Sequence, residues 1–415
     1  MSELNYLEKL LDGVEVEWRT LGDTSLFEIA NNGRKPVKAS LRIAGETPYY
    51  GANNIQDYVD GYTHDGEYVL IAEDGSASLE NYSIQYATGK FWANNHVHVV
   101  RGKERVHSRF LYHYLCIVNF LPFLTGGGRA KLTKGQLIEI PVPIPCPDNP
   151  EKSLAIQSEI VRVLDKFTAL TAELTAELTA RKKQYNYYRD QLLSFDEEQE
   201  KPIYLEKLLD GVEWRTLGEI AVIYDGTHQT PKYTASGVPF VSVENIKNLY
   251  GTNKYISPED FKTYKNKPRK HDLFMTRIGD VGTCAIVEDD RPLAYYVTLA
   301  LIRINQQIAV PGFIRYLIES RFGKAELYKR TLIHAVPMKI NLGEIGKVAV
   351  PIPCPDNPEK SLAIQSEIVR ILDKFDTLTN SITEGLPREI ELRQKQYEYY
   401  RDLLFSFPKP DSVTN

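Results

Sequence analysis

The sequence contains few cysteines and no long apolar run. Its 415 residues include four cysteines, and two of these, Cys146 and Cys354, lie in copies of one segment, IPCPDNP. So few cysteines, with no Cys-x-x-Cys pair, exclude a disulfide scaffold. No stretch of about 18 apolar residues occurs, and no basic segment leads into an apolar one at the start, so we expect neither a membrane span nor a signal peptide. We therefore expect a cytoplasmic protein.

Motifs of common enzymes are also missing. There is no GxxxxGK[ST] phosphate loop, no GxGxxG, no HExxH and no GxSxG. His96 and His98 alternate along an expected strand, so the two rings face opposite sides and we expect no shared metal. The segment PDNPEK resembles a nuclease motif only superficially, because it lacks the E-x-K spacing. We predict a protein without a catalytic or metal site.

The strongest feature of the sequence is internal repetition, which is typical of tandem architectures. Tyr6–Gly22 returns at Tyr204–Gly218 with two residues fewer, and Val142–Phe167 returns at Val350–Phe375 with a single Val-to-Ile change. Between the repeats lie two stretches with no obvious relation to each other. We predict an N-terminal repeated segment (1–22), variable domain 1 (23–142), a central repeated helical region (143–217), variable domain 2 (218–350) and a C-terminal repeated helical region (351–415).

The repeated regions, here called the frame, predict long helices. After the proline-rich PIPCPDNP, apolar residues follow steps of four and three from Ile156 to Leu174, the spacing of a coiled coil. The tetrapeptide TAEL occurs twice, at Thr171–Leu174 and Thr175–Leu178, and adds a second consecutive step of four. In the second copy, Gly385 and Pro387 predict a kink or break. We expect antiparallel packing of the two helices; two amphipathic helices on separate cores are the alternative.

The N-terminal repeat is displaced from the place that a simple duplication would give it. It matches the segment that follows the first long helix. By analogy, we expect it to pack beside the end of the second long helix, near the C-terminus. The sequence therefore predicts an α+β fold in which two α/β domains are joined by an antiparallel pair of long helices in a pseudo-twofold cyclic arrangement.

The formal net charge of −5 is unevenly distributed. Residues 23–142 carry 12 basic and 12 acidic residues, residues 218–350 carry 18 and 13, and the frame has a net charge of −10. Basic residues cluster near aromatic residues and glycines at Gly126–Gly135, Lys262–Lys270 and Arg321–Arg330. Such clusters suit a phosphate backbone, and a solvated charge run is the alternative for each.

The variable domains show mixed patterns of strand and helix. Strands are expected at residues 67–77, 90–100 and 238–246, and helices at residues 109–121 and 312–328. The loops at residues 47–59 and 225–234 carry Asn, Gln, Thr, His and Tyr side chains, which can hydrogen-bond base edges. Ordinary turn chemistry explains these residues almost as well.

Several segments together resemble the DNA-specificity (S) subunit of type I restriction-modification systems, most closely its IC subfamily. They are VPIP, AIQSEIV, the TAEL repeats, PYYGANNIQDYVDGY (48–62), KFWANNH (90–96) and GTHQTPKYTASGVPFVSVENI (226–246). The resemblance implies that each variable domain is a target recognition domain for one half of a split, asymmetric site in double-stranded DNA.

The resemblance also implies partners. The frame would recruit two methyltransferase (modification) subunits that bring S-adenosylmethionine, and restriction (motor/nuclease) subunits would add cleavage that depends on ATP and Mg²⁺. This chain itself would be non-catalytic and hold no cofactor.

Carried over position by position, the resemblance suggests residues near DNA. In variable domain 1 these are Tyr49, Tyr50, Asn53, Asn54, Arg129, Lys131 and Lys134. In variable domain 2 they are Thr227, His228, Gln229, Thr230, Lys232, Arg277 and Lys339. The pattern fixes neither the base that each contacts nor the two half-site sequences.

Two other classes of protein stay open as alternatives. A stand-alone DNA-binding regulatory protein would need high affinity by itself, whereas the acidic frame suggests that a partner supplies much of the phosphate contact. A methyltransferase fused to its own recognition domain would need a glycine-rich nucleotide-binding motif, and the absence of that motif argues against it.

Overall fold

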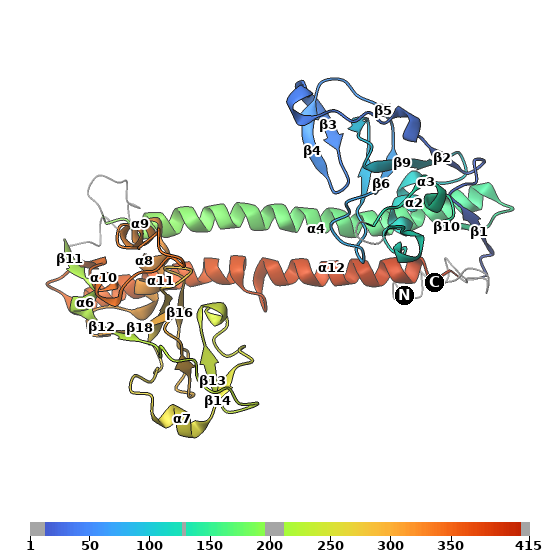
Figure 1. The fold of residues 1–415 in the computed structure, drawn as a ribbon. Coiled ribbons are helices and arrows are strands. Elements are labelled where there is room, and N and C mark those ends of the chain that lie inside the picture. The colour runs from blue at the N-terminus through green and yellow to red at the C-terminus, as the bar shows by residue number, and fades with distance from the viewer. Residues whose placement is uncertain (1–12, 127–129, 196–210, 408–415) are drawn as a thin grey trace. The chain divides into compact units, whose positions relative to one another are not determined.

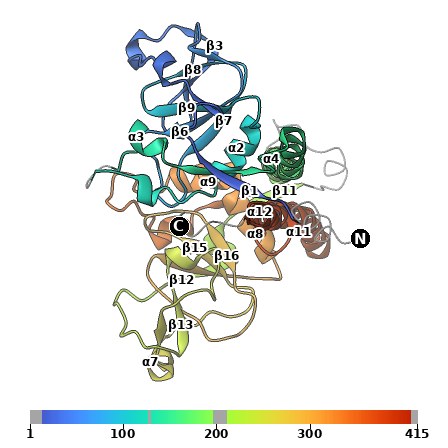
Figure 2. The same ribbon diagram turned by 90° about the vertical axis from the view of Figure 1, so that its right-hand side faces the viewer.

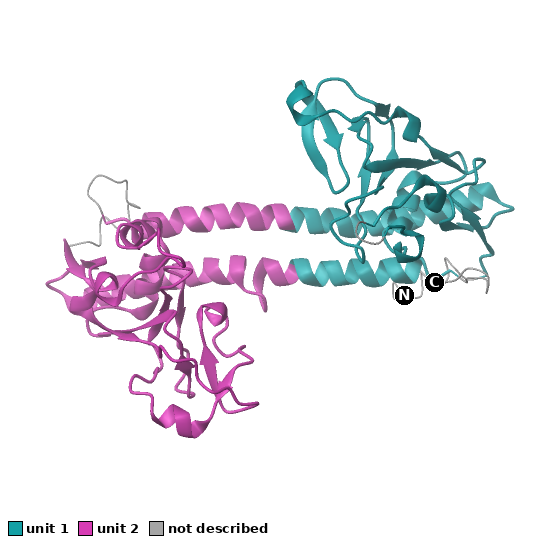
Figure 3. Ribbon diagram, in the orientation of Figure 1, with its two compact units in different colours: residues 1–174, 390–415 teal, residues 175–389 magenta. Residues whose placement is uncertain are grey.

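The computed structural model describes residues 13–126, 130–195 and 211–407 (Figure 1). The chain divides into two compact units, unit 1 with residues 1–174 and 390–415 and unit 2 with residues 175–389 (Figure 3). Helix α4 (Pro150–Leu192) continues from unit 1 into unit 2, and helix α12 (Gly385–Leu404) continues from unit 2 into unit 1. Unit 1 thus contains both the early strands and the end of the last helix, as the displaced N-terminal repeat predicts.

A two-stranded antiparallel sheet introduces each long helix. The pairs are β1 (Val16–Thr20) with β10 (Pro141–Pro145), and β11 (Val212–Thr216) with β19 (Ala349–Pro353). In β10, proline takes every second position, so the missing N–H groups all lie on the side of the strand that does not face β1. Val142 and Ile144, between the prolines, are buried. The proline-rich segment is therefore a strand and not part of the helix.

Capping residues start the two copies of the long helix. Asn149 Oδ1 accepts a hydrogen bond from Lys152 N, and Asn357 Oδ1 accepts one from Lys360 N, both at 3.0 Å. The second copy is interrupted, because residues 381–384 separate the end of α11 (Pro358–Asn380) from the start of α12 at Gly385. The predicted break near Gly385 is confirmed.

The frame helices pack in pairs inside each unit. In unit 1, α12 runs antiparallel to α4 (Figure 1), and Phe167 stacks on Tyr400 with ring centroids 5.2 Å apart. In unit 2, the later part of α4 packs on α11, where the rings of Tyr188 and Phe375 are 5.6 Å apart. The predicted seam is not buried along its whole length, since Leu170 is 36% exposed.

Two layers of strands form the variable part of unit 1 (Figure 2). The proximal sheet, whose strands share a core with α4, contains in order β2 (Phe27–Ile29), β9 (Val97–Gly102), β6 (Tyr68–Ala72) and β7 (Ile84–Ala87). The distal sheet contains in order β4 (Ile55–Val59), β3 (Ala44–Tyr50), β8 (Lys90–Ala93) and β5 (His64–Asp65). Helix α2 (Ser108–Leu115) packs on the proximal sheet, and α3 (Lys134–Leu137) precedes β10.

The variable part of unit 2 has the same topology, except that the described part of its distal sheet has no counterpart of β5. Its proximal sheet contains in order β12 (Ala221–Asp225), β18 (Leu299–Ile304), β15 (Leu273–Thr276) and β16 (Cys284–Ile286). Its distal sheet contains β14 (Tyr255–Ile256), β13 (Val238–Val241) and β17 (Ala294–Tyr295). The helices are α6 (Leu217–Ile220), α7 (Pro258–Lys262), α8 (Pro311–Glu319), α9 (Arg321–Tyr328) and α10 (Leu342–Ile345). The two variable domains, which looked unrelated in sequence, therefore share one fold.

Most predicted elements of the variable domains are present, but the helix expected at residues 109–121 ends at Leu115, and two other elements are divided. The strand expected at residues 90–100 is two strands, β8 and β9, which belong to different sheets. The helix expected at residues 312–328 is two helices, because Ser320 has an extended backbone and caps α9 through its hydroxyl. Short 3₁₀ turns complete the domains: η1 (Asn31–Gly33), η2 (Ala39–Leu41), η3 (Leu121–Phe123) and η4 (Val243–Asn245).

Candidate nucleic-acid interface

In variable domain 1, the turn at residues 73–77, after β6, joins the two segments predicted to lie near DNA. Asn53 Nδ2 donates a hydrogen bond to the carbonyl of Gly75 at 2.8 Å, and its Oδ1 accepts one from Ala77 N at 2.8 Å. From the other segment, Lys131 Nζ lies 3.0 Å from Glu73 Oε1. The structure thus brings both segments to one surface, with the Asn53 amide used to hold the turn.

The other predicted residues of domain 1 differ in exposure. Tyr49 is 1% exposed, and its hydroxyl accepts a hydrogen bond from Val37 N at 3.0 Å. This corrects the expectation for Tyr49, whose side chain belongs to the core. Tyr50 is half-buried, and burial raises its pKa. Asn54 and Lys134 are exposed, whereas Arg129 lies outside the described residues.

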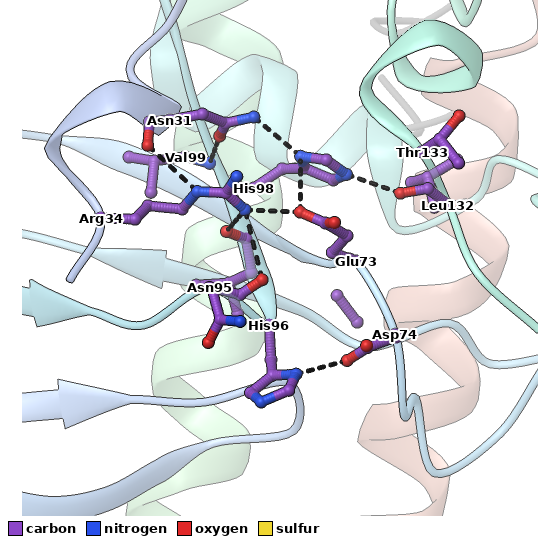
Figure 4. Close-up of polar contacts among 12 residues, drawn as sticks. Asn31, Arg34, Glu73, Asp74, Asn95, His96, His98, Val99, Leu132 and Thr133 are labelled. Atoms are coloured by element: carbon purple, nitrogen blue, oxygen red, sulfur yellow. Dashed lines mark hydrogen bonds and ion pairs between the residues drawn. The ribbon is translucent and has the colours of Figure 1, made fainter. Parts of the chain in front are cut away.

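A polar network beneath this surface fixes the turn (Figure 4). Arg34 donates to Glu73 Oε2 at 2.6 Å and to the carbonyl of Val97 at 2.9 Å. Glu73 thus accepts from Arg34 on one oxygen and faces Lys131 with the other. Its pKa is held below the usual range by these two cations, although burial acts in the opposite direction. An ionised Glu73 therefore links the Lys131 loop to the body of the domain.

His98 is the buried end of this network. Its Nε2 lies 2.7 Å from the carbonyl of Leu132, and its Nδ1 lies 2.9 Å from Nδ2 of Asn31. A carbonyl can only accept, so Nε2 carries the proton and Nδ1 accepts from Asn31. Burial lowers the pKa of His98, in agreement with a neutral ring. His96 has a different partner, Asp74 Oδ1, at 2.5 Å.

In variable domain 2, Arg277 lies inside the domain. It is 7% exposed, and it donates to Asp225 Oδ1 at 2.6 Å, to the carbonyl of Val297 at 3.1 Å and to the carbonyl of Ile340 at 3.2 Å. The second oxygen of Asp225 contacts His228 Nε2 at 2.8 Å. This corrects the expectation for Arg277, which supports the loop at residues 225–232 from within.

The remaining predicted residues of domain 2 lie on the surface around this support. Thr227 is half-buried and its Oγ1 accepts from Gln229 N at 3.3 Å. The exposed residues are His228, Gln229, Thr230, Lys232 and Lys339. Lys339 forms a β-bridge with Ile278, as Lys131 does with Asp74 in domain 1. The two loop surfaces are therefore built on the same backbone arrangement.

Sequence reasoning missed the residues that support these surfaces: Asn31, Arg34, Glu73, His98 and Asp225. Each is an ordinary residue type in a strand or turn. Its role arises from strand pairing across a long sequence separation, as with Asn31 and His98, which are 67 positions apart. Periodicity carries no signal for such pairs.

Metal-binding clusters and membrane-spanning helices are absent from the described residues. Within residues 13–126, 130–195 and 211–407, no three His, Cys, Asp or Glu side chains are grouped so that they could hold a metal ion. In the same ranges, no helix combines the length and the apolar character needed to cross a membrane.

The fold defines a tandem protein in which two loop-presenting α/β domains are joined by long repeated helices. Residues 14–181 and 210–392 match the family described as "Type I restriction modification DNA specificity domain". A putative type I restriction enzyme specificity subunit of Haemophilus influenzae is 45% identical, over 97% of this chain and 98% of the relative. The EcoR124I/EcoR124II specificity subunit of Escherichia coli is 38% identical over 100% of both chains.

Solved structures show the same fold at low identity. The S subunit of a type I system from M. genitalium has a TM-score of 0.59 at 15% identity, over 96% of this chain and 98% of that one. A chain from a study of complex assembly and conformational transition of the type I system has a TM-score of 0.52 at 14% identity, over 94% and 97%.

The chain belongs to the type I restriction-modification DNA specificity family. It is a specificity subunit with two target recognition domains, the non-catalytic component of such a system. Its place in the IC subfamily stays a prediction.

Proposed function

We propose that each variable domain reads one half of a bipartite, asymmetric DNA site, and that the frame sets the gap between the halves and binds two methyltransferase subunits. The relatives' names, as specificity subunits of restriction enzymes, support the DNA-reading role. The solved chain from a study of complex assembly supports the role of partners.

One observation carries the proposal: the two domains share one topology but present different side chains from equivalent loops. The loop after β12 exposes His228, Gln229 and Thr230, whereas the loop after β2 exposes Lys35 and Lys38 at the corresponding place. A common backbone with different polar groups is what reading two different sequences requires, since base edges differ in their donors and acceptors.

In addition to Lys35 and Lys38, we assign the DNA-facing role to the exposed or half-buried residues that the sequence predicts near DNA, except Asn53, whose amide holds the turn. They are Tyr50, Asn54, Lys131 and Lys134 in domain 1, with Arg129 kept as a prediction, and Thr227, His228, Gln229, Thr230, Lys232 and Lys339 in domain 2. The buried Tyr49 and Arg277 support the surfaces from behind, whereas Asn53 is itself exposed and holds the turn through its amide. Domain 2, from residue 218 to 350, also carries an excess of basic residues, 18 against 13 acidic.

The frame is the proposed partner-binding part. Its net charge of −10 disfavours wrapping by DNA and leaves protein partners as its ligands. Those partners would supply S-adenosylmethionine, and with restriction subunits also ATP and Mg²⁺, in the cytoplasm. The domain boundaries at residues 23–142 and 218–350 are part of this proposal.

Domain exchange tests the proposal. Residues 23–142 are replaced by the corresponding part of another specificity subunit, and the chimera is produced with its methyltransferase subunits for sequencing of methylated sites. We expect one half-site to change while the other half and the gap persist. The reciprocal exchange of residues 218–350 is the matched control and should change the other half.

Two results would contradict the proposal. In the first, either exchange alters both halves. In the second, the unmodified chain binds a single undivided site and supports no methylation with any methyltransferase subunit, which would favour the stand-alone regulator.

A further inference from the structure

Two frame helices, α4 and α11, each contain a glutamine that is completely buried near the start of the helix. Gln157 in α4 and Gln365 in α11 occupy the same position of the repeat, and both are 0% exposed. A buried amide group destabilises a fold unless its polar atoms are hydrogen-bonded. The neighbouring variable domain supplies two of these hydrogen bonds in each unit, and a serine of the same helix, Ser153 or Ser361, accepts a third.

The partners are backbone atoms just before the helix that rests on the frame. Gln157 Oε1 accepts from His107 N at 2.8 Å, and its Nε2 donates to the carbonyl of Arg105 at 3.1 Å. The glutamine of unit 2 makes the same two bonds, with Val310 N at 2.9 Å and the carbonyl of Ile308 at 3.2 Å. Because main-chain groups do not depend on residue type, the frame holds two unlike segments through identical bonds.

A second contact lies eight residues further along each frame helix, at a repeated aspartate. Asp165 Oδ1 accepts a hydrogen bond from His113 Nε2 at 2.8 Å, and Asp373 Oδ1 accepts one from the Tyr316 hydroxyl at 2.6 Å. Counted from the first residues of α2 and α8, both donors are the sixth residue. A histidine in one domain and a tyrosine in the other therefore donate to equivalent aspartates of the frame.

A third contact is aromatic and involves the third residue of each helix. Phe110 of α2 packs on Phe405, with ring centroids 5.3 Å apart. Phe313 of α8 packs on Phe195, with centroids 6.1 Å apart. Phe405 and Phe195 both closely follow the end of the frame helix that pairs with the glutamine-bearing helix of their unit. In each unit, the docked helix thus contacts one frame helix and the segment that follows the other.

We propose that these residues form a docking site, repeated in the two units, for the first helix that a recognition domain lays on the frame. The site accepts a domain whose helix has unpaired main-chain groups before its first residue, phenylalanine as its third residue and a hydrogen-bond donor as its sixth. Gln157 and Gln365 are then positioning residues, because they fix the orientation from which each domain presents its loops. The DNA readout of this role rests on the proposed function, whereas the docking itself does not.

The test compares Gln157→Met and Gln365→Met in the full chain, since methionine has a similar volume but no hydrogen-bonding amide. Amide hydrogen exchange is followed in residues 105–110 and 308–313. We expect exchange about tenfold faster in the segment of the altered unit, the effect of losing one or two hydrogen bonds, and no change in the other. With methyltransferase subunits present, discrimination against single-base changes should fall several-fold in one half-site only. Each variant is the control for the other.

The aspartate contact is tested in the same assays by His113→Gln and His113→Leu. Glutamine keeps an N–H donor for Asp165 and should retain protection, whereas leucine should lose it. This pair keeps the proposal testable if the glutamine variants do not fold.

Three outcomes overturn the proposal: unchanged exchange near residue 107 in Gln157→Met, faster exchange in both domains of either variant, or lost protection with full discrimination in both half-sites. Faster exchange in the expected segment, together with no sequence recognition even by the unmodified chain with its partners, would support the docking site and contradict the proposed function.

Discussion

Glu73 and Arg277 occupy the same backbone position in the two recognition domains and carry opposite charges. The carbonyl of Glu73 accepts a hydrogen bond from Leu132 N at 2.8 Å, and the carbonyl of Arg277 accepts one from Ile340 N at 2.9 Å. In domain 1 the carboxylate pairs with Lys131, the residue just before Leu132. In domain 2 the buried guanidinium of Arg277 forms an ion pair with Asp225. The equivalent lysines, Lys131 and Lys339, therefore precede residues whose N–H groups bond to Glu73 in one domain and to Arg277 in the other.

This difference predicts unequal contributions of the two lysines to DNA affinity. Lys131 is ion-paired with Glu73, whereas Lys339 is exposed and, among the residues that the structure describes, forms no side-chain hydrogen bond or ion pair. A lysine on a phosphate releases about one counterion, so Lys339→Ala should reduce the slope of log affinity against log salt by about 1. Lys131→Ala should change it less. Binding of the partner-loaded complex over a range of salt concentrations measures both.

Both lysines are exposed, so neither alanine variant should alter the free energy of unfolding by more than about 0.5 kcal/mol. Equal losses of slope in the two variants would contradict the assignment. Glu73→Gln in domain 1 is a further check, because removing the carboxylate should increase the contribution of Lys131.

Arg277 leads to a second prediction, about geometry at constant charge. Its guanidinium donates hydrogen bonds to Asp225 and to two carbonyls at once, and the single ammonium group of lysine cannot reproduce this geometry. We expect Arg277→Lys to destabilise domain 2 by about 1–3 kcal/mol and to weaken reading of its half-site. Thermal unfolding and methylated-site sequencing check this, with Lys247→Arg as the exposed control. Full discrimination by the lysine variant would show that the loop does not depend on Arg277.

The frame was predictable from the sequence, whereas the support of the loop surfaces was not. Near-identical repeats and the heptad spacing from Ile156 predicted α4, and Gly385 with Pro387 predicted the interruption before α12. The shared topology of the variable domains stayed hidden, because their equivalent positions hold residues as unlike as Glu73 and Arg277. The pairing register of the strands brings such residues to equivalent positions, and this register cannot be recognised from the periodicity of the sequence.

His113 gives a prediction about pH. It is 0% exposed and faces Asp165, Arg109, Tyr397 and Arg401. Burial lowers its pKa to about 4, although Asp165 acts in the opposite direction. The folded state therefore favours the neutral ring. Its contribution is fully present above about pH 6.5 and is lost as the pH falls towards 4, by at most about 3 kcal/mol.

His113→Gln should remove this part of the pH dependence and keep a donor for Asp165. The difference in the free energy of unfolding between pH 7 and pH 5 should then be smaller for the variant than for the unmodified chain. His98, whose pKa burial also lowers, is present in both proteins and cancels in the comparison. Chemical unfolding at the two pH values measures the difference, and equal differences would contradict a neutral His113.

The TAEL repeats give the last prediction, because the boundary between the two compact units falls between them, at Leu174 and Thr175. Each TAEL tetrapeptide adds about 6 Å of helix and rotates the rest of the helix by roughly 40° beyond a full turn. One base pair of B-DNA requires about 3.4 Å and roughly 35°. A third TAEL after Leu178 should keep both half-sites and lengthen the unread gap, by about one base pair. Replacing Thr175 by alanine, at constant length, is the control and should leave the gap unchanged. Methylated-site sequencing of both variants measures the gap. An unchanged gap with full activity in the insertion variant would mean that helix length does not set the spacing.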